Sequence, residues 1–249
     1  MTGRYIILFF LLITLRQCKV PSVRLTGITD PDIVLVNIED GDRAFLGKLL
    51  FKIDSLKPIV IGINIFFQNE KDMKQDSILI TALKKINNDI LVYGVDRNGK
   101  FSHSQANFTS LVSDEGFLEY EKTFNLTSNM TPVPEIENKV HESFPLKIVN
   151  HWKPDFKSMI KVNKTIPIKY TRTLENFIRI NGSSLLETNI NDFDLSNKII
   201  LLGYIGPGEE DKYFTPLRLV KGKYKEDEPD TYGLVIIANE IRTILEYKK

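Results

Sequence analysis

The sequence predicts an α/β fold with a mostly parallel central sheet, flanking helices and a large irregular insertion in the middle. Two patterns predict this fold. In the first third of the chain, short β-branched apolar runs alternate with segments whose apolar residues recur at helical spacing. In the last third, another apolar run precedes a further segment with helical spacing of its apolar residues. Strands that alternate with helices are joined by right-handed crossovers, which make neighbouring strands parallel.

The first third supplies three predicted strands and two predicted helices. Residues 33–38, 59–67 and 90–95 are apolar runs rich in Ile and Val, which is typical of strands buried on both faces. Residues 43–56 and 72–85 lie between these runs and place their apolar side chains on one helical face. The order strand, helix, strand, helix, strand therefore predicts the start of a parallel sheet.

The middle of the chain, residues 97–172, is polar and shows no sustained periodicity. We expect an insertion there with some structure of its own. Within it, residues 144–149 and 166–170 are predicted as strands and residues 154–160 as a short helix. A further strand is predicted at residues 177–180.

Regular structure returns with a buried strand at residues 199–202 and a closing helix at 235–247. Between them, Gly203, Gly206 and Gly208 form a glycine-rich turn. Their spacing is neither that of a dinucleotide fingerprint nor that of a P-loop. The acidic residues that follow would also repel phosphate, so we interpret these glycines as a structural turn.

Composition excludes several classes of protein. The chain has 33 Lys and Arg residues against 32 Asp and Glu residues, so it lacks the basic excess of a general nucleic-acid binder. Its single cysteine, Cys18, rules out an internal disulfide framework and zinc sites built from several cysteines. The abundance of Ile, Lys and Asn is typical of an AT-rich bacterial genome.

Residues 5–15 form an apolar run interrupted only by Thr14 and flanked by Arg4 and Arg16. A helix of that length spans about half of a ~30 Å hydrocarbon core. The length suits the apolar region of a signal peptide. The lack of a small-x-small cleavage site instead favours an uncleaved short membrane anchor. A third alternative is lipidation of the Cys18 side chain. In all three cases we expect residues 1–20 to target the chain. The remainder would then be exported to the periplasmic or extracellular face, and a retained segment would anchor it in the inner membrane.

Four carboxylates are the candidate ligand contacts. Glu39, Asp40 and Asp42 follow the first predicted strand, and Asp211 follows the last one. Ligands of α/β proteins bind at the carboxyl edge of the sheet, and carboxylate oxygens suit Ca²⁺ or Mg²⁺. However, the spacing is not that of an EF-hand. The alternative is that the first three acids cap the next helix, so whether these carboxylates bind a metal ion stays open.

Catalytic motifs are absent from the sequence. The three histidines, His103, His141 and His151, fall in the irregular middle and outside any metal or nucleophile motif, and no serine stands in a G-x-S-x-G elbow. The only cysteine lies in the targeting segment. General acid–base and covalent catalysis need a positioned base or an activated nucleophile, so we expect neither catalysis nor a cofactor.

The order of several motifs resembles the CHASE domain of the second type, an extracytoplasmic sensory domain associated with cyclases and histidine kinases. The resemblance covers residues 30–247. Two departures are Ile237, where the family usually has a histidine, and Asn64, where its second strand usually ends in aspartate. The motifs are DPDIVLV at 30–36, PIVIGINIF at 58–66, LSNKIILLG at 195–203, Asp211, Thr215-Pro216 and YGLVIIAN at 232–239.

The resemblance implies a non-catalytic sensory or ligand-binding module that acts through a partner, such as a membrane signalling protein. Its small ligand is unknown, its membrane contact would be the N-terminal segment, and nucleic acid is not expected. The family's membrane helices and output modules do not appear in this sequence. Two alternatives therefore stay open: an α/β hydrolytic enzyme that uses the loop carboxylates, and a truncated remnant of a larger receptor.

Overall fold

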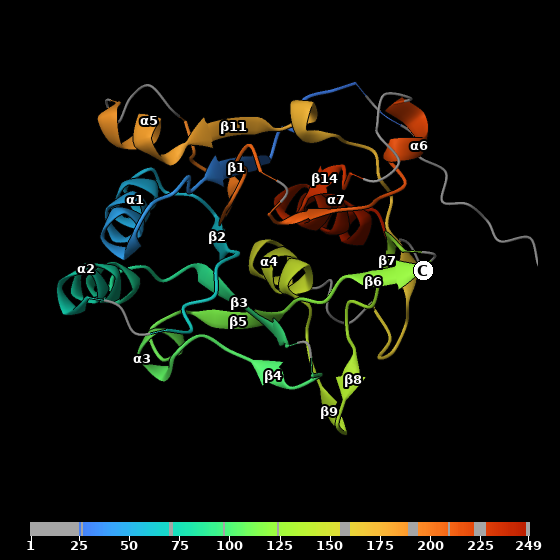
Figure 1. Ribbon diagram of the computed structural model, residues 1–249, viewed down its shortest axis with the longest axis horizontal. Coiled ribbons are helices and arrows are strands. Elements are labelled where there is room, and N and C mark those ends of the chain that lie inside the picture. Colours follow the sequence, from blue (N-terminus) through green and yellow to red (C-terminus); the bar gives the residue numbers. More distant parts are fainter. Residues whose placement is uncertain are drawn as a thin grey trace, which may run out of the picture.

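A seven-stranded sheet forms the centre of the protein (Figure 1). The computed structural model describes residues 25, 27–69, 72–96, 98–123, 125–154, 160–188, 194–208, 210–221 and 228–247. The strand order is β11-β1-β12-β2-β3, and β3 pairs further with both β4 and β5. Every pair is parallel except that of β3 with β4. The strands are β1 Ile33–Asn37, β2 Val60–Ile63, β3 Asp89–Val95, β4 Phe101–Ser102, β5 Asp114–Phe117, β11 Ile178–Asn181 and β12 Ile199–Gly203.

Helices cover both faces of this sheet (Figure 1). One face packs against α1, α2, α3 and α5, and the other packs against α4 and α7. Ile33 and Leu35 of β1 point into the α4–α7 cluster, whereas Val34 and Val36 point into the opposite one. β1 is therefore buried on both faces, as are the neighbouring strands β12 and β2, whereas β11 at the edge of the sheet is largely exposed. The helices are α1 Arg43–Ser55, α2 Met73–Leu83, α3 Ala106–Thr109, α4 Phe144–Trp152, α5 Gly182–Glu187 and α7 Gly233–Leu245.

Smaller elements surround the main sheet. A three-stranded antiparallel sheet lies near the end of α7, and two antiparallel strand pairs and two short helices complete the described parts of the chain. These elements are β6 Glu121–Thr123, β7 Leu126–Met130, β10 Ile166–Pro167, β8 Glu135–Ile136, β9 Lys139–Val140, β13 Lys212–Tyr213, β14 Thr231–Tyr232, α6 Arg218–Lys221 and the 3₁₀ helix Leu174–Asn176.

Most of the predicted elements are confirmed, including all five of the first third, although β2 is shorter than predicted. One prediction is wrong: residues 144–149 form the helix α4 rather than a strand. The Ser143 hydroxyl accepts a hydrogen bond from the Leu146 amide at 3.3 Å, and Pro145 lies in the first turn. These are the start signals of a helix, and they outweigh the apolar run. Residues 1–20, and most of the helix predicted at 154–160, lie outside the described residues.

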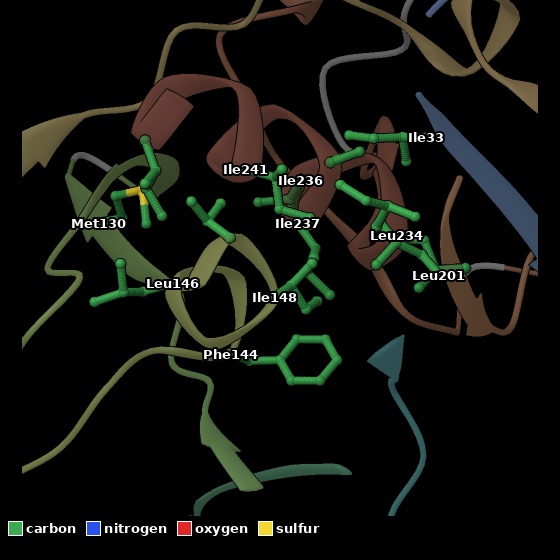
Figure 2. Packing of buried hydrophobic residues seen from close by; sticks show 14 of the residues in the cluster. Ile33, Met130, Phe144, Leu146, Ile148, Leu201, Leu234, Ile236, Ile237 and Ile241 are labelled. Carbon is green, nitrogen blue, oxygen red and sulfur yellow. The ribbon is translucent and has the colours of Figure 1, made fainter. Parts of the chain in front are cut away.

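The irregular middle contributes directly to the core. It supplies β5 to the central sheet and α4 to the face that α7 covers. Figure 2 shows Leu146 and Ile148 of α4 opposite Ile237 and Ile241 of α7. The insertion is therefore part of the same folded unit as the α/β elements on either side of it.

The helix α7 is buried almost all round, since eleven of its thirteen residues are buried. Its buried polar side chains consequently need partners within the protein. The Asn239 amide accepts from the Thr171 and Arg172 backbone amides at 3.1 and 3.2 Å and donates to the Arg172 carbonyl at 3.0 Å. The Thr243 hydroxyl accepts from the Lys169 amide at 2.9 Å. α7 thus holds the segment that leads into β11.

An ion-pair network ties the end of α7 to the start of β1. The Arg242 guanidinium donates to Asp30 Oδ2 at 2.7 Å and to Asp32 Oδ2 at 2.8 Å, and Arg172 Nε lies 2.8 Å from Asp30 Oδ2. Asp30 is buried, and its Oδ1 also accepts from the Ile33 amide at 2.9 Å. The first strand and the last helix are therefore joined through one buried carboxylate.

Within the described residues, none of the helices combines the length and the apolar character needed to cross a bilayer. The apolar run at residues 5–15 lies outside that part of the chain.

The strand assignment predicts the effect of a charge in the sheet. Ile61 lies on β2 between β12 and β3 and has no exposed surface. We expect Ile61→Asp to abolish cooperative folding, because an unpaired buried charge costs several kcal/mol against a total stability of about 5–15 kcal/mol. Circular dichroism during urea unfolding measures this loss. Ile178→Asp is the control, since Ile178 is 44% exposed on β11 and should fold. A soluble Ile61→Asp variant that unfolds cooperatively would contradict the assignment.

Candidate functional site

A groove lies at the carboxyl ends of β1 and β11. Its volume is about 550 Å³, within the range of small-molecule sites. Arg179 and Asn181 come from β11, Asn37 ends β1, and Ile205 follows β12. α7, the long helix that follows β12, lies on the opposite face of the sheet from α1, so the connections after β1 and β12 separate at this edge. Ligands of open α/β sheets bind at such a separation.

Asn37 fixes the geometry of this edge. Its Oδ1 accepts hydrogen bonds from the Glu39 amide at 3.1 Å and from the Ile205 amide at 2.9 Å. Its Nδ2 donates to Asn181 Oδ1 at 3.3 Å. One side chain thus links the loop after β1, the loop after β12 and the end of β11.

The first three predicted carboxylates occupy three different environments. Asp42 caps α1, because its Oδ1 accepts from the Phe45 amide at 2.8 Å. Glu39 does not line the groove, and its carboxylate accepts from the Ser183 amide at 2.8 Å and from the Ser183 hydroxyl at 3.1 Å. Asp40 is exposed to solvent. Among the described residues, no group of three or more His, Cys, Asp or Glu side chains is arranged to hold a metal ion.

Asp211 lies apart from the other three, at the start of α7. Its backbone is left-handed, with φ of 58°, and its carbonyl accepts from the Gly233 amide at 2.8 Å. A Cβ atom at position 233 would lie 2.7 Å from each Asp211 carboxylate oxygen and 2.8 Å from the Tyr120 hydroxyl. Only glycine therefore lets α7 begin against this carboxylate.

Burial raises the pKa of the Asp211 carboxyl from 3.8 to about 6, and a hydrogen bond with Tyr213 opposes that rise. The Tyr120 and Tyr213 rings are 4.3 Å apart between centroids. Burial, followed by the charge of Asp211, raises the pKa of the Tyr120 hydroxyl well above 10. A half-buried carboxyl with such a pKa can bind a proton or a cation near neutral pH.

Sequence reasoning missed the two tyrosines near Asp211 and the buried acid Glu240 further along α7. Tyr120 falls in the segment without periodicity, so nothing in the sequence signals its position. Glu240 carried a usable signal, because it lies three residues after Ile237 and four before Ile244, on the apolar face of α7. A charged residue on such a face predicts a buried, functional or paired group.

Two of the three histidines surround one tyrosine of β3. The His141 Nδ1 atom lies 2.7 Å from the Tyr93 hydroxyl, and the His103 ring stacks on the Tyr93 ring with centroids 4.5 Å apart. His103 Nδ1 also lies 3.2 Å from Glu115 Oε1. His151 lies in α4, which corrects the expectation that every histidine falls outside the regular elements.

The pKa of Asp211 predicts a pH-dependent stability. Because its pKa is higher in the folded chain, the folded state binds more protons than the unfolded state between pH 3.8 and about 6. Stability should therefore fall as the pH rises through this window, by about 3 kcal/mol for this group. Asp211→Asn should abolish that component, and asparagine tolerates the left-handed backbone. Urea unfolding from pH 4 to pH 7 measures it.

Tyr213→Phe serves as the comparison for this titration. Because the Tyr213 hydroxyl opposes the rise in the pKa of Asp211, its removal should move the transition to higher pH. Parallel stability profiles for the wild type and Asp211→Asn would contradict the titration of Asp211.

A protein-family model matches most of this chain. The model of the CHASE2 domain matches residues 8–249, which is nearly the whole chain. No curated protein and no solved structure matches at a significant level. Several residues shared with the family motifs have structural roles, since Asp30 pairs with Arg242, Gly233 admits Asp211, and Asn239 holds the segment before β11. The chain belongs to the CHASE2 family, whose members are extracytoplasmic sensory domains.

Proposed function

We propose that this protein is an exported, non-catalytic sensory domain that binds a small ligand and signals through a partner protein. The groove at the carboxyl ends of β1 and β11 carries this proposal, because its position is that of ligand sites in α/β sheets. Residues 1–20 would target the chain, and a retained segment would tether it to the membrane. The sensory domain would extend over residues 30–247.

The contacts around the groove support a route from the ligand to α7. Ile205 lines the groove and is held by Asn37, and the loop that follows it leads to Asp211 at the start of α7. Glu39 and Asp40 lie at the same edge of the sheet. We propose Glu39, Asp40 and Asp211 as polar ligand contacts, whereas the cap formed by Asp42 gives that residue a structural role.

A hydrolytic enzyme is the second candidate function. The observation in its favour is the pKa of about 6 of the Asp211 carboxyl, which suits general acid–base catalysis. Among the described residues, however, the contacts of Asp211 are with Tyr213 and Gly233, and those of Glu39 and Asp42 are with Ser183 and Phe45. Turnover in a hydrolase screen that Asp211→Ala abolishes would favour the enzyme over the sensor.

Export can be tested with a reporter. A fusion of alkaline phosphatase after Lys249 should be active, because that enzyme folds only outside the cytoplasm. Deletion of residues 5–15 should abolish this activity while the fusion is still produced. The matched fusion of a cytoplasm-dependent fluorescent protein should show the reverse pattern. Activity of the cytoplasmic reporter alone in the intact chain would contradict the proposed localisation.

A further inference from the structure

A small cavity lies beside Glu240 of α7. It is enclosed by α7, the start of α4 and the segment that joins β5 to β6. Its volume is about 30 Å³, which is enough to hold one molecule or ion about the size of water. Phe117, Met130 and Pro145 form much of the apolar wall. The cavity is distinct from the groove at the carboxyl edge of β1.

Glu240 is the unsatisfied polar side chain of α7. The residue is only 2% exposed, and its Oε2 atom has no hydrogen-bond partner in the described part of the chain. Asn239, Arg242 and Thr243 on the same helix all have partners. An ionised carboxylate in such surroundings is strongly disfavoured unless a positive charge or a proton accompanies it.

The lining of the cavity favours a positive charge. Glu119 is exposed at the cavity, Glu121 is half-buried, and Glu240 is buried, so negative charge extends from the solvent to the interior. Ser143 and Thr131 add hydroxyl oxygens. None of the described lining residues is basic. A cleft lined by one sign of charge concentrates ions of the opposite sign.

The size and the charge of the site restrict the ligand. A cluster of three carboxylates that would hold a divalent metal is not found among the described residues. Among the described residues that line the cavity, Glu240 is the one buried carboxylate, and its ionised form balances a single positive charge. Alkali-metal and ammonium ions carry that charge in a volume close to that of water. A larger organic cation would not fit the cavity of about 30 Å³.

We propose that this cavity binds a small monovalent cation, an alkali-metal or ammonium ion, with Glu240 as its charged ligand. The cation would supply the partner that Glu240 Oε2 lacks among the described residues. The site goes beyond the sensory function, since it requires neither the groove nor a signalling partner. Cation binding and signalling can therefore fail independently of one another.

A proton competes with the cation for the same carboxylate. Burial, followed by the charge of Glu121, raises the pKa of Glu240 well above 4.5. The other ionisable groups that face it are Glu119 at the cavity and the hydroxyls of Tyr120 and Tyr170, which stay neutral because their own pKa values are raised well above 10. Binding should therefore weaken as the pH falls and Glu240 takes up its proton.

Thermal unfolding of the full chain in different salts tests the proposal. The probes are the chlorides of K⁺, Na⁺ and ammonium, each compared at pH 8 and equal ionic strength with tetramethylammonium chloride, whose cation is too large for the cavity. At least one small cation should raise Tm by about 5 °C near saturation. The order of the three responses distinguishes an alkali-metal site from an ammonium site. Equal Tm values in all four salts would overturn the proposal.

Two variants, one in α7 and one at the residue just after it, localise the response. Glu240→Gln keeps the shape of the side chain and removes its charge, so it should fold in tetramethylammonium chloride and lose the response to small cations. Glu246→Gln, on the exposed surface of the same region, should keep the wild-type response. A response retained by Glu240→Gln would contradict the site.

The pH dependence of the wild type gives a readout that needs no variant. The stabilisation by the small cation should be smaller at pH 5 than at pH 8, because the proton competes for the carboxylate as the pH falls. A stabilisation of equal size at pH 5 and pH 8 would show that the cation binds elsewhere.

Discussion

The buried ion pair between Asp30 and Arg242 is the constraint on which the rest of the structure depends. It joins Asp30, three residues before the first strand, to the last turn of the final helix, 212 positions away. Asp30 has no exposed surface on its side chain, so its charge is balanced inside the protein by Arg242 and Arg172. Breaking such a pair leaves an uncompensated charge, which costs about 3–5 kcal/mol. The chain ends of the domain are therefore held together by electrostatics as well as by packing.

The path of the chain from β12 to α7 also separates two loops at the edge of the sheet where ligands are expected. β12 is inserted between β1 and β2, and it delivers the chain to α7 on the face opposite α1. This crossing separates the loops at the carboxyl ends of β1 and β12, where Asn37 bridges them. The same helix carries Gly233 against Asp211 at its start and Glu240 against a cavity two turns later. One buried helix thus contacts both acidic sites.

Much of the fold could be predicted from the sequence, because its strands are apolar runs and its helices are amphipathic or capped. The capping role of Asp42 is one of two open interpretations, and the hydrogen bond from the Phe45 amide to Asp42 Oδ1 supports it. The cluster of Tyr120, Tyr213 and Asp211 could not be predicted, since its members meet only through the packing of the irregular middle against α7. The strand predicted at residues 144–149 is wrong, because Ser143 and Pro145 are helix-start signals that outweigh the apolar run. Long-range pairs such as Asp30 with Arg242 leave no local pattern in the sequence.

A double-mutant cycle on Asp30 and Arg242 tests most directly that polar contacts of α7 hold the fold together. The variants are Asp30→Asn, Arg242→Gln and their combination, with the free energy of unfolding measured by urea titration. The exposed pair Lys169 and Glu246, at the end of the same helix, provides the control cycle, which should show a coupling of a few tenths of a kcal/mol at most. For the buried pair we predict a coupling energy of about 2 kcal/mol or more. Additivity of the two single variants within about 0.5 kcal/mol would contradict the anchoring role of this pair.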